Sequence, residues 1–388
     1  MLAPTYVSSG VGGKPTVEFS TVNVQVVSGL GSTAGTRNGE GNLIVGYAEN
    51  PHSLDRTGSN NLIVGSEGGW TNDGDLIAGL GNQATNPYSA VFGQANIARG
   101  QGELLGGMNN DAWGQNASIT GGQSNQAAGA ESSVTGGELN YARDTASSVD
   151  GGGNNIAAGP FSFIGGGCNN LTGSLTQPSP ACGNNGNPID GFETILGGYG
   201  DTASGFVASA TGGSGNTAST YFASATGGTG NTASGNGSSV SGGNDNTASG
   251  SGSSITGGVE SIASGSWASV TGGSRNTASD YWTSVSGGDQ NTADGYDDSV
   301  SGGQMNNAAG TDNSISGGDG NQATTGTDSS ITGGQGNLTT SSYDSILGGG
   351  GNETTSLYYS ILGGHNRTMS GASDAGYSSE AGPTLFNP

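Results

Sequence analysis

The chain has 388 residues and a net charge of −23, from 30 acidic and 7 basic residues. Nucleic acids and anionic membranes are bound through cationic patches, so this charge argues against both as partners. The sequence has no run of 18 apolar residues, which excludes a transmembrane helix. The 81 glycines would indicate disorder if the apolar residues did not recur at a regular spacing.

Residues 1–42 lie before the region in which apolar residues recur. The N-terminus has neither the charged nor the apolar segment of a signal peptide, so we expect none. Residues 21–26 alternate polar and apolar side chains, which predicts a half-buried strand. We expect this strand to cap the repeat that follows, because an uncapped end exposes unpaired backbone groups.

The repeat begins irregularly over residues 43–107. Its apolar groups lie at residues 43–46, 62–65, 76–79 and 91–93, separated by uneven steps. These units are more apolar than the later ones. From Leu104 onward we expect a regular step of 15.

The regular repeat covers residues 108–369 with a period of 15. One apolar residue, here called the anchor, stands between Ser or Thr residues and is followed by a pair of glycines. Anchors include Val240, Ile255, Val270, Val285, Val300 and Ile315. So short a period predicts an all-β fold, a parallel β-solenoid of about 21 coils. At a strand spacing of about 4.8 Å, the coils would form a rod on the order of 100 Å long.

Each coil is expected to contain two short strands. In one coil, residues 239–241 predict the first strand and residues 246–249 the second. Val240 and Ala248 should point inward, because side chains alternate along a strand. The glycine pair after the anchor would supply a turn that other residues resist.

The repeat is interrupted once, at residues 168–194, where about 16 residues are added to one coil. This insertion contains both cysteines, Cys168 and Cys182. A disulfide between them would contribute roughly 3 kcal/mol and would indicate an oxidising environment. Two unpaired thiols are the alternative. The tail, residues 370–388, loses the repeat and is expected to be flexible.

Residues at the same place in successive coils stack into columns. The residue six places after the anchor is asparagine in most coils, and we expect these side chains to form a structural hydrogen-bonded ladder. The ladder residues are Asn125, Asn140, Asn155, Asn216, Asn231, Asn246, Asn276 and Asn291.

Hydroxyl side chains flank the anchor on both sides, as Ser239 and Ser241 flank Val240. Such columns resemble the faces of β-solenoid ice-binding proteins, although most positions here are Ser, which lacks the methyl group of Thr. A polar face that is solvated or packed against a neighbouring chain is the alternative.

A third column, three residues before the anchor, is often aromatic. Asp297 and Asp312 occupy the same place in other coils, so we expect it to lie near solvent. Exposed rings along a rod suit glycan stacking or protein contact, and packing over a turn or at a subunit seam is the alternative. The candidate ligand-binding residues are Tyr88, Phe222, Trp267, Trp282, Tyr343 and Tyr358.

No pattern points to catalysis, a metal or a cofactor. His52 and His365 are far apart in sequence, and no nucleophile motif accompanies them. The His and Cys spacings match no metal-binding motif, and no Lys follows the glycine pairs as a phosphate loop requires. We therefore expect a protein without enzymatic activity, cofactor or metal.

Residues 238–243 (Ser-Ser-Val-Ser-Gly-Gly) and 246–250 (Asn-Thr-Ala-Ser-Gly) resemble the head repeats of YadA-like trimeric autotransporter adhesins and similar repeats of phage tail fibres. The resemblance covers roughly residues 104–370. It implies a left-handed parallel β-roll from each chain, a bundle of three chains and a role in binding surfaces. The period of the family repeat is usually 14, whereas the period here is 15, and we see no heptad stalk or C-terminal membrane segment.

These features favour a structural and adhesive fibre protein on a cell surface, in the extracellular space or on the surface of a virion or other particle. Burial of one Val or Ile and one Ala per coil contributes roughly 2–4 kcal/mol, so self-association into a homo-oligomer, a trimer by analogy, would add needed burial. Its partner would be a cell-surface glycan or protein. The alternatives are a subunit of a self-assembling extracellular filament and an ice-binding protein that uses the Ser/Thr columns.

Overall fold

The computed structural model describes residues 5–33, 35–173, 192–371 and 378–380. These residues form an all-β parallel solenoid of about 21 coils with a spacing of about 15 residues. No α-helix occurs among them. The fold class predicted from the period is therefore confirmed. The chain divides into two compact units, Met1–Ser124 (unit 1) and Asn125–Pro388 (unit 2).

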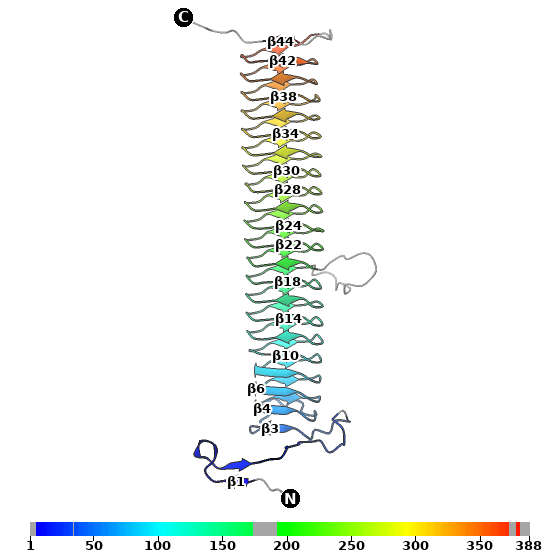
Figure 1. The fold of residues 1–388 in the computed structure, drawn as a ribbon, viewed down its shortest axis with the longest axis vertical. Helices are drawn as coiled ribbons and strands as arrows, with labels where there is room; N and C mark the ends of the chain where they lie inside the picture. Colours follow the sequence, from blue (N-terminus) through cyan, green and yellow to red (C-terminus); the bar gives the residue numbers. More distant parts are fainter. Residues whose placement is uncertain (1–4, 34, 174–191, 372–377, 381–388) are drawn as a thin grey trace. The chain divides into compact units, whose positions relative to one another are not determined.

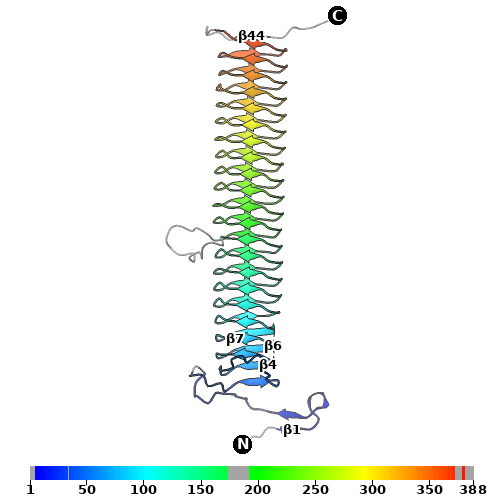
Figure 2. The same ribbon diagram turned by 180° about the vertical axis from the view of Figure 1, so that it is seen from behind.

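Each coil of unit 2 contributes one strand to each of two parallel ladders, whose stacked strands Figures 1 and 2 show from opposite sides. Each strand pairs with its equivalent one coil away, for example Ser239 with Ser254 and Val240 with Ile255. The first-strand ladder contains β14 (Ser133–Val134), β16 (Ser148–Val149), β18 (Phe163–Ile164), β20 (Thr194–Ile195), β22 (Ser209–Ala210), β24 (Ser224–Ala225), β26 (Ser239–Val240), β28 (Ser254–Ile255), β30 (Ser269–Val270), β32 (Ser284–Val285), β34 (Ser299–Val300), β36 (Ser314–Ile315), β38 (Ser330–Ile331), β40 (Ser345–Ile346), β42 (Tyr359–Ile361) and β44 (Ser378–Glu380). The second-strand ladder contains β13 (Gln126–Ala127), β15 (Tyr141–Ala142), β17 (Ile156–Ala157), β19 (Leu171–Thr172), β21 (Thr202–Ala203), β23 (Thr217–Ala218), β25 (Thr232–Ala233), β27 (Thr247–Ala248), β29 (Ile262–Ala263), β31 (Thr277–Ala278), β33 (Thr292–Ala293), β35 (Asn307–Ala308), β37 (Gln322–Ala323), β39 (Leu338–Thr339), β41 (Glu353–Thr354) and β43 (Thr368–Met369).

The apolar core of unit 2 lies between the two ladders. Because alternate residues of a strand point to opposite faces, β26 turns Val240 inward and β27 turns Ala248 inward, and both are fully buried. The residues before them, Ser239 and Thr247, are only half-buried. The inward positions predicted from the sequence are therefore confirmed.

The first-strand ladder keeps its register across the insertion. Phe163 pairs with Thr194 and Ile164 pairs with Ile195, although the step between these two anchors is about twice that of an ordinary coil. The added residues thus leave the coils on either side in contact. Cys168 is exposed, and Cys182 lies outside the described residues, so the disulfide stays a prediction.

Unit 1 begins with a two-stranded antiparallel sheet. β1 (Thr5–Val7) pairs with β2 (Thr16–Glu18), and a short 3-10 turn, Val11–Gly13, lies between them. The solenoid of unit 1 then has the first strands β3 (Leu43–Val45), β4 (Leu62–Ser66), β6 (Leu76–Leu80), β8 (Ala90–Gln94), β10 (Leu104–Leu105) and β12 (Ser118–Ile119). Its second strands are β5 (Gly69–Trp70), β7 (Gln83–Ala84), β9 (Ile97–Ala98) and β11 (Asp111–Ala112).

The strand predicted at residues 21–26 is wrong. These residues are exposed and belong to no strand, because the strands of this region pair with each other at β1 and β2 instead. Period-two alternation needs a neighbouring strand before it becomes a sheet, and residues 21–26 have none.

The tail predicted to be flexible contributes one strand. Ser378–Glu380 forms β44, which pairs in parallel with β42, Tyr359 lying opposite Ser378. The first-strand ladder therefore extends into residues 370–388.

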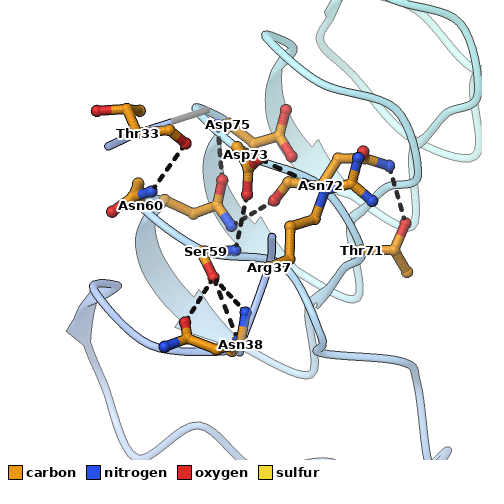
Figure 3. A network of polar contacts seen from close by, with 12 residues as sticks. Thr33, Arg37, Asn38, Ser59, Asn60, Thr71, Asn72, Asp73 and Asp75 are labelled. Atoms are coloured by element: carbon orange, nitrogen blue, oxygen red, sulfur yellow. Dashed lines mark hydrogen bonds and ion pairs between the residues drawn. The ribbon is translucent and has the colours of Figure 1, made fainter. Parts of the chain in front are cut away.

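Polar contacts hold the segment before the first coils of unit 1, as Figure 3 shows. Arg37 Nε lies 3.4 Å from Asp73 Oδ2. The Ser59 hydroxyl donates to Asn38 Oδ1 at 3.1 Å and accepts the backbone N–H of Asn38 at 3.1 Å. These contacts, and not the predicted strand, tie the N-terminal segment to the solenoid.

The early coils are more regular than predicted. Paired residues of the first-strand ladder follow one another at a uniform step of 14: Leu62, Leu76, Ala90, Leu104 and Ser118. Only the step from Leu43 to Leu62 is longer. Leu104, predicted as an anchor, is 43% exposed, and the buried anchor is Leu105. The longer step of the regular repeat therefore starts one coil later than expected.

One glycine distinguishes the 15-residue coils from the 14-residue coils. Gly93 in a short coil and Gly243 in a long coil correspond, since both have positive φ and both face the carbonyl oxygen of a glycine in the next coil. The added residue is Gly242, the first of the pair, around whose Cβ position the structure has open space. It acts as a bulge, because the five-residue strand of the short coil becomes a two-residue strand followed by an isolated bridge at Asn244.

Candidate binding surface

The residue three places before the anchor has a left-handed backbone. Trp267 has φ of 61° and Trp282 has φ of 65°, and Asn116 and Asp297 have the same conformation in other coils. Asn, Asp and Gly adopt this conformation readily, whereas for other residues it costs roughly 1–2 kcal/mol. The aromatic residues at this place therefore sit where the backbone disfavours them.

These aromatic side chains project into solvent. Their exposed fractions run from 41% for Phe161 to 61% for Phe222. The expectation that the column lies near solvent is confirmed. We call the set the aromatic column: Tyr88, Phe161, Phe192, Phe222, Trp267, Trp282, Tyr343 and Tyr358.

Aromatic residues one place earlier in the coil extend the column. The Tyr281 ring stacks on Trp282, with centroids 5.9 Å apart, and on Tyr296, also 5.9 Å away and nearly parallel. A second group is centred on Phe206, whose ring contacts Phe222 edge-on at 6.1 Å. The rings thus form small exposed clusters along unit 2.

The sequence reasoning missed the left-handed conformation and the additional rings. The signal for the backbone was present, because glycine stands at the same place in Gly237 and Gly252. The additional rings, Phe206, Tyr221, Tyr281 and Tyr296, share a phase of their own one residue earlier. Their contacts with the aromatic column depend on the turn geometry, which a period alone does not give.

Carboxylates lie beside the Tyr281 stack. Asp280 accepts the backbone N–H of Tyr281 at 2.6 Å. Burial, together with the nearby charge of Asp280, raises the pKa of Asp294. Ring faces next to hydrogen-bond acceptors suit a sugar, which has an apolar C–H face and hydroxyl donors.

The predicted asparagine ladder is present, and its members are fully buried. The backbone N–H of Asn246 donates to Asn231 Oδ1 at 3.1 Å, and its Nδ2 donates to the carbonyls of Gly242 at 3.1 Å and Gly258 at 2.9 Å. Each Asn thus links three coils, mainly through side chain to backbone bonds. The role of this column is structural.

Unit 1 has an equivalent asparagine ladder, and the ladder of unit 2 has exceptions. Asn82 and Asn96 belong to the ladder of unit 1 but follow their anchors by five residues. The sequence pattern placed the ladder six residues after the anchor and therefore did not identify them. Asp201 and Ser261 take the place of Asn in two coils of unit 2. Asp201 Oδ2 is buried without a hydrogen-bond partner.

The two hydroxyl columns differ in exposure. Ser239 and its equivalents before the anchor are half-buried, and some bond along the ladder, as Ser209 does to Ser224 at 3.2 Å. Ser241 and its equivalents after the anchor are exposed. Only the second column therefore offers a hydroxyl surface to a partner.

In unit 1 the corresponding face is apolar. Leu62, Val64, Phe92 and Leu104, the residues beside the anchors, are 37–43% exposed, and together we call them the apolar face. A cavity of about 340 Å³ opens beside Phe92 and Leu104 and continues over Gly106 to Thr120. Contiguous exposed apolar side chains of this kind mark contact surfaces.

Comparisons with known proteins add no relative. No protein-family model matches the chain, and no curated protein matches it. Among the residues that the structure describes, no group of three or more His, Cys, Asp and Glu side chains is placed to hold a metal ion. Within the same residues no helix is long and apolar enough to span a membrane.

Proposed function

We propose that the protein is a non-enzymatic adhesive fibre protein of a cell or particle surface that binds glycans through its aromatic column. The combination of backbone strain and exposure in this column supports the proposal most. Trp267 and Trp282 keep a left-handed backbone although more than half of each side chain is exposed. Exposed rings gain little from burial, so fold stability does not explain their position, whereas a ligand would.

Replacement of the two tryptophans by asparagine tests this function. Asn116 occupies the same left-handed position, so Trp267→Asn and Trp282→Asn should leave the coil intact. Stacked rings contribute roughly 1 kcal/mol each, so the double variant should lose about 2 kcal/mol and bind immobilised glycans about thirtyfold more weakly. Trp113→Asn is the matched control, because Trp113 is equally exposed but outside the aromatic column.

Two results would overturn the glycan proposal. One is a double variant that binds glycans as strongly as the unchanged protein. The other is an unchanged protein that binds no glycan on an array but binds a protein receptor, which would keep the adhesive role and change its ligand.

We also propose that the protein works as a homo-oligomer, a trimer by analogy, assembled through the apolar face of unit 1. That face would otherwise leave large aliphatic side chains in water. The 14-residue step from Leu62 to Ser118 supports the resemblance to YadA-like head repeats, whose usual period is the same. The left-handed roll belongs to this analogy.

Two alternatives have different supporting observations. An ice-binding role would use the exposed hydroxyl column, which includes Thr256 and Thr271, and predicts thermal hysteresis that bulky replacements abolish. A filament role would use the N-terminal sheet, where Tyr6 and Val17 are more than half exposed, and predicts filaments that vanish when residues 1–30 are deleted.

A further inference from the structure

In both units the residue two places before the anchor also points inward, and these residues form a second inner column within each unit. In many coils this residue is a small buried Ser or Ala, as at Ser132, Ser238 and Ala268. Several coils place a buried carboxyl group there instead: Asp75, Glu103, Glu193, Asp298 and Asp344. The core of the solenoid therefore contains acidic groups that the adhesive surface does not use.

Two carboxyl groups of this column, Asp75 and Glu103, lie in unit 1. Asp75 and Glu103 are only 3% and 2% exposed. Asp75 Oδ1 accepts the backbone N–H of Ser89 at 2.9 Å, but its Oδ2 has no hydrogen-bond partner. Neither side-chain oxygen of Glu103 has a partner. An ionised carboxylate in such a place is strongly unfavourable, whereas the neutral acid is tolerated.

The surrounding charges do not compensate for this burial. The charge that acts on Asp75 is Asp73, which has the same sign and is itself paired with Arg37. Glu103 faces Arg99 and Asp111, which pair with each other at 2.9 Å.

Burial is the main influence on both groups. It raises the pKa of Asp75 to about 7, although the backbone hydrogen bond from Ser89 offsets part of this rise, and it raises the pKa of Glu103 to about 8.

We propose that Asp75 and Glu103 make unit 1 a pH-sensitive part of the fold, closed when both carboxyl groups are protonated and loosened when they ionise. The two groups lie two coils apart in the same inner column, and both contact Ser89 of the coil between them, so ionisation of either disturbs the stacking on that coil. Unit 1 would thus be more stable at mildly acidic pH than at alkaline pH.

The direction follows from proton binding. The ordinary pKa values of Asp and Glu are 3.8 and 4.5, well below the folded values of about 7 and about 8. Between these limits the folded state holds more protons than the unfolded state, so stability falls as the pH rises. The contribution is complete below about pH 4 and is lost above about pH 8.

Thermal unfolding of the full chain, followed by tryptophan fluorescence, tests the proposal. Trp70 is 3% exposed, whereas the other three tryptophans are more than half exposed, so the blue-shifted emission reports on unit 1. We expect its midpoint to fall by about 10 °C or more between pH 5 and pH 9. The variant Asp75→Asn with Glu103→Gln should lose this fall. Asparagine already occupies the same place at Asn61 and Asn313, so the coil accepts it.

Glu49→Gln is the matched control, because it removes an exposed acid of the same unit and should keep the full pH dependence. A pH slope that persists in the double variant overturns the proposal. Should the double variant fail to fold, infrared spectroscopy of the unchanged protein decides. The carbonyl band of protonated carboxyl groups should remain at pH 6, and its absence would contradict the proposal.

Discussion

Units 1 and 2 have the same kind of core but differ in their turns and faces. Both bury an aliphatic anchor and an asparagine ladder, yet the coils of β6 and β8 in unit 1 have 14 residues and five-residue strands, whereas the regular coils of unit 2 have 15 residues and two-residue strands. The face beside the anchors is apolar in unit 1 and mainly hydroxyl in unit 2. The added residue lies in the glycine turn, away from the core. Coil length and face chemistry can therefore change while the interior stays the same.

The glycine turn should give the largest effect. Gly243→Ala would drive a Cβ into the Gly258 carbonyl oxygen at positive φ, so we expect the free energy of unfolding to fall by at least about 2 kcal/mol. Gly242→Ala meets open space and should be neutral or slightly stabilising, because Ala restricts the unfolded chain. Denaturant unfolding of both variants measures the difference, and equal losses would refute Gly242 as the bulge.

The two faces should respond differently to a new charge. Phe92→Asp places a carboxylate on the apolar face of unit 1 and, if the proposed oligomer forms through this face, should convert it to single chains. Thr256→Asp makes the matched change on the hydroxyl face of unit 2 and should leave the mass unchanged. Light scattering after size exclusion measures both. A single-chain mass for the unchanged protein would contradict assembly through this face.

Repair of the asparagine ladder in unit 2 should give the smallest effect. Burial raises the pKa of Asp201, so its ionised form is disfavoured in the fold, and Asp201→Asn should stabilise unit 2 by about 1 kcal/mol at neutral pH. The new amide can donate to glycine carbonyls as Asn216 does to Gly212 and Gly228. The gain should be smaller in acid, where Asp201 is protonated and only the new amide hydrogen bonds remain as a benefit. An equal gain at low and neutral pH would show that the charge is not the cause.

The repeat predicted the interior of unit 2 well. A period of 15 with one anchor per coil was enough to place Val240 and Ala248 inward and to find the Asn246 column, because stacking makes each place in the coil equivalent. The aromatic column was also found, since its rings recur at one phase. These features could be predicted from the period because each recurs at the same place in successive coils.

Features that depend on chain geometry were not predictable in this way. The Leu105 anchor was displaced by one residue, because two adjacent leucines give no sign of which points inward. Trp282 has a left-handed backbone, a conformation that tryptophan rarely adopts. Glu103 is buried at a place where many other coils have a small residue. The strand predicted at residues 21–26 was wrong, because alternating polar and apolar residues do not ensure that a neighbouring strand is available for pairing.

The near-identity of successive coils creates a risk of misalignment during folding. A segment that slips by one whole coil keeps anchor on anchor and loses few contacts. The chain contains unequal steps that oppose such a slip. The step from Ile164 to Ile195 spans the insertion, and the step from Ile315 to Ile331 is one residue longer than its neighbours. A slipped segment that crossed either step would leave one coil too long and another too short to close. The coils of unequal length thus favour a single alignment of the repetitive chain.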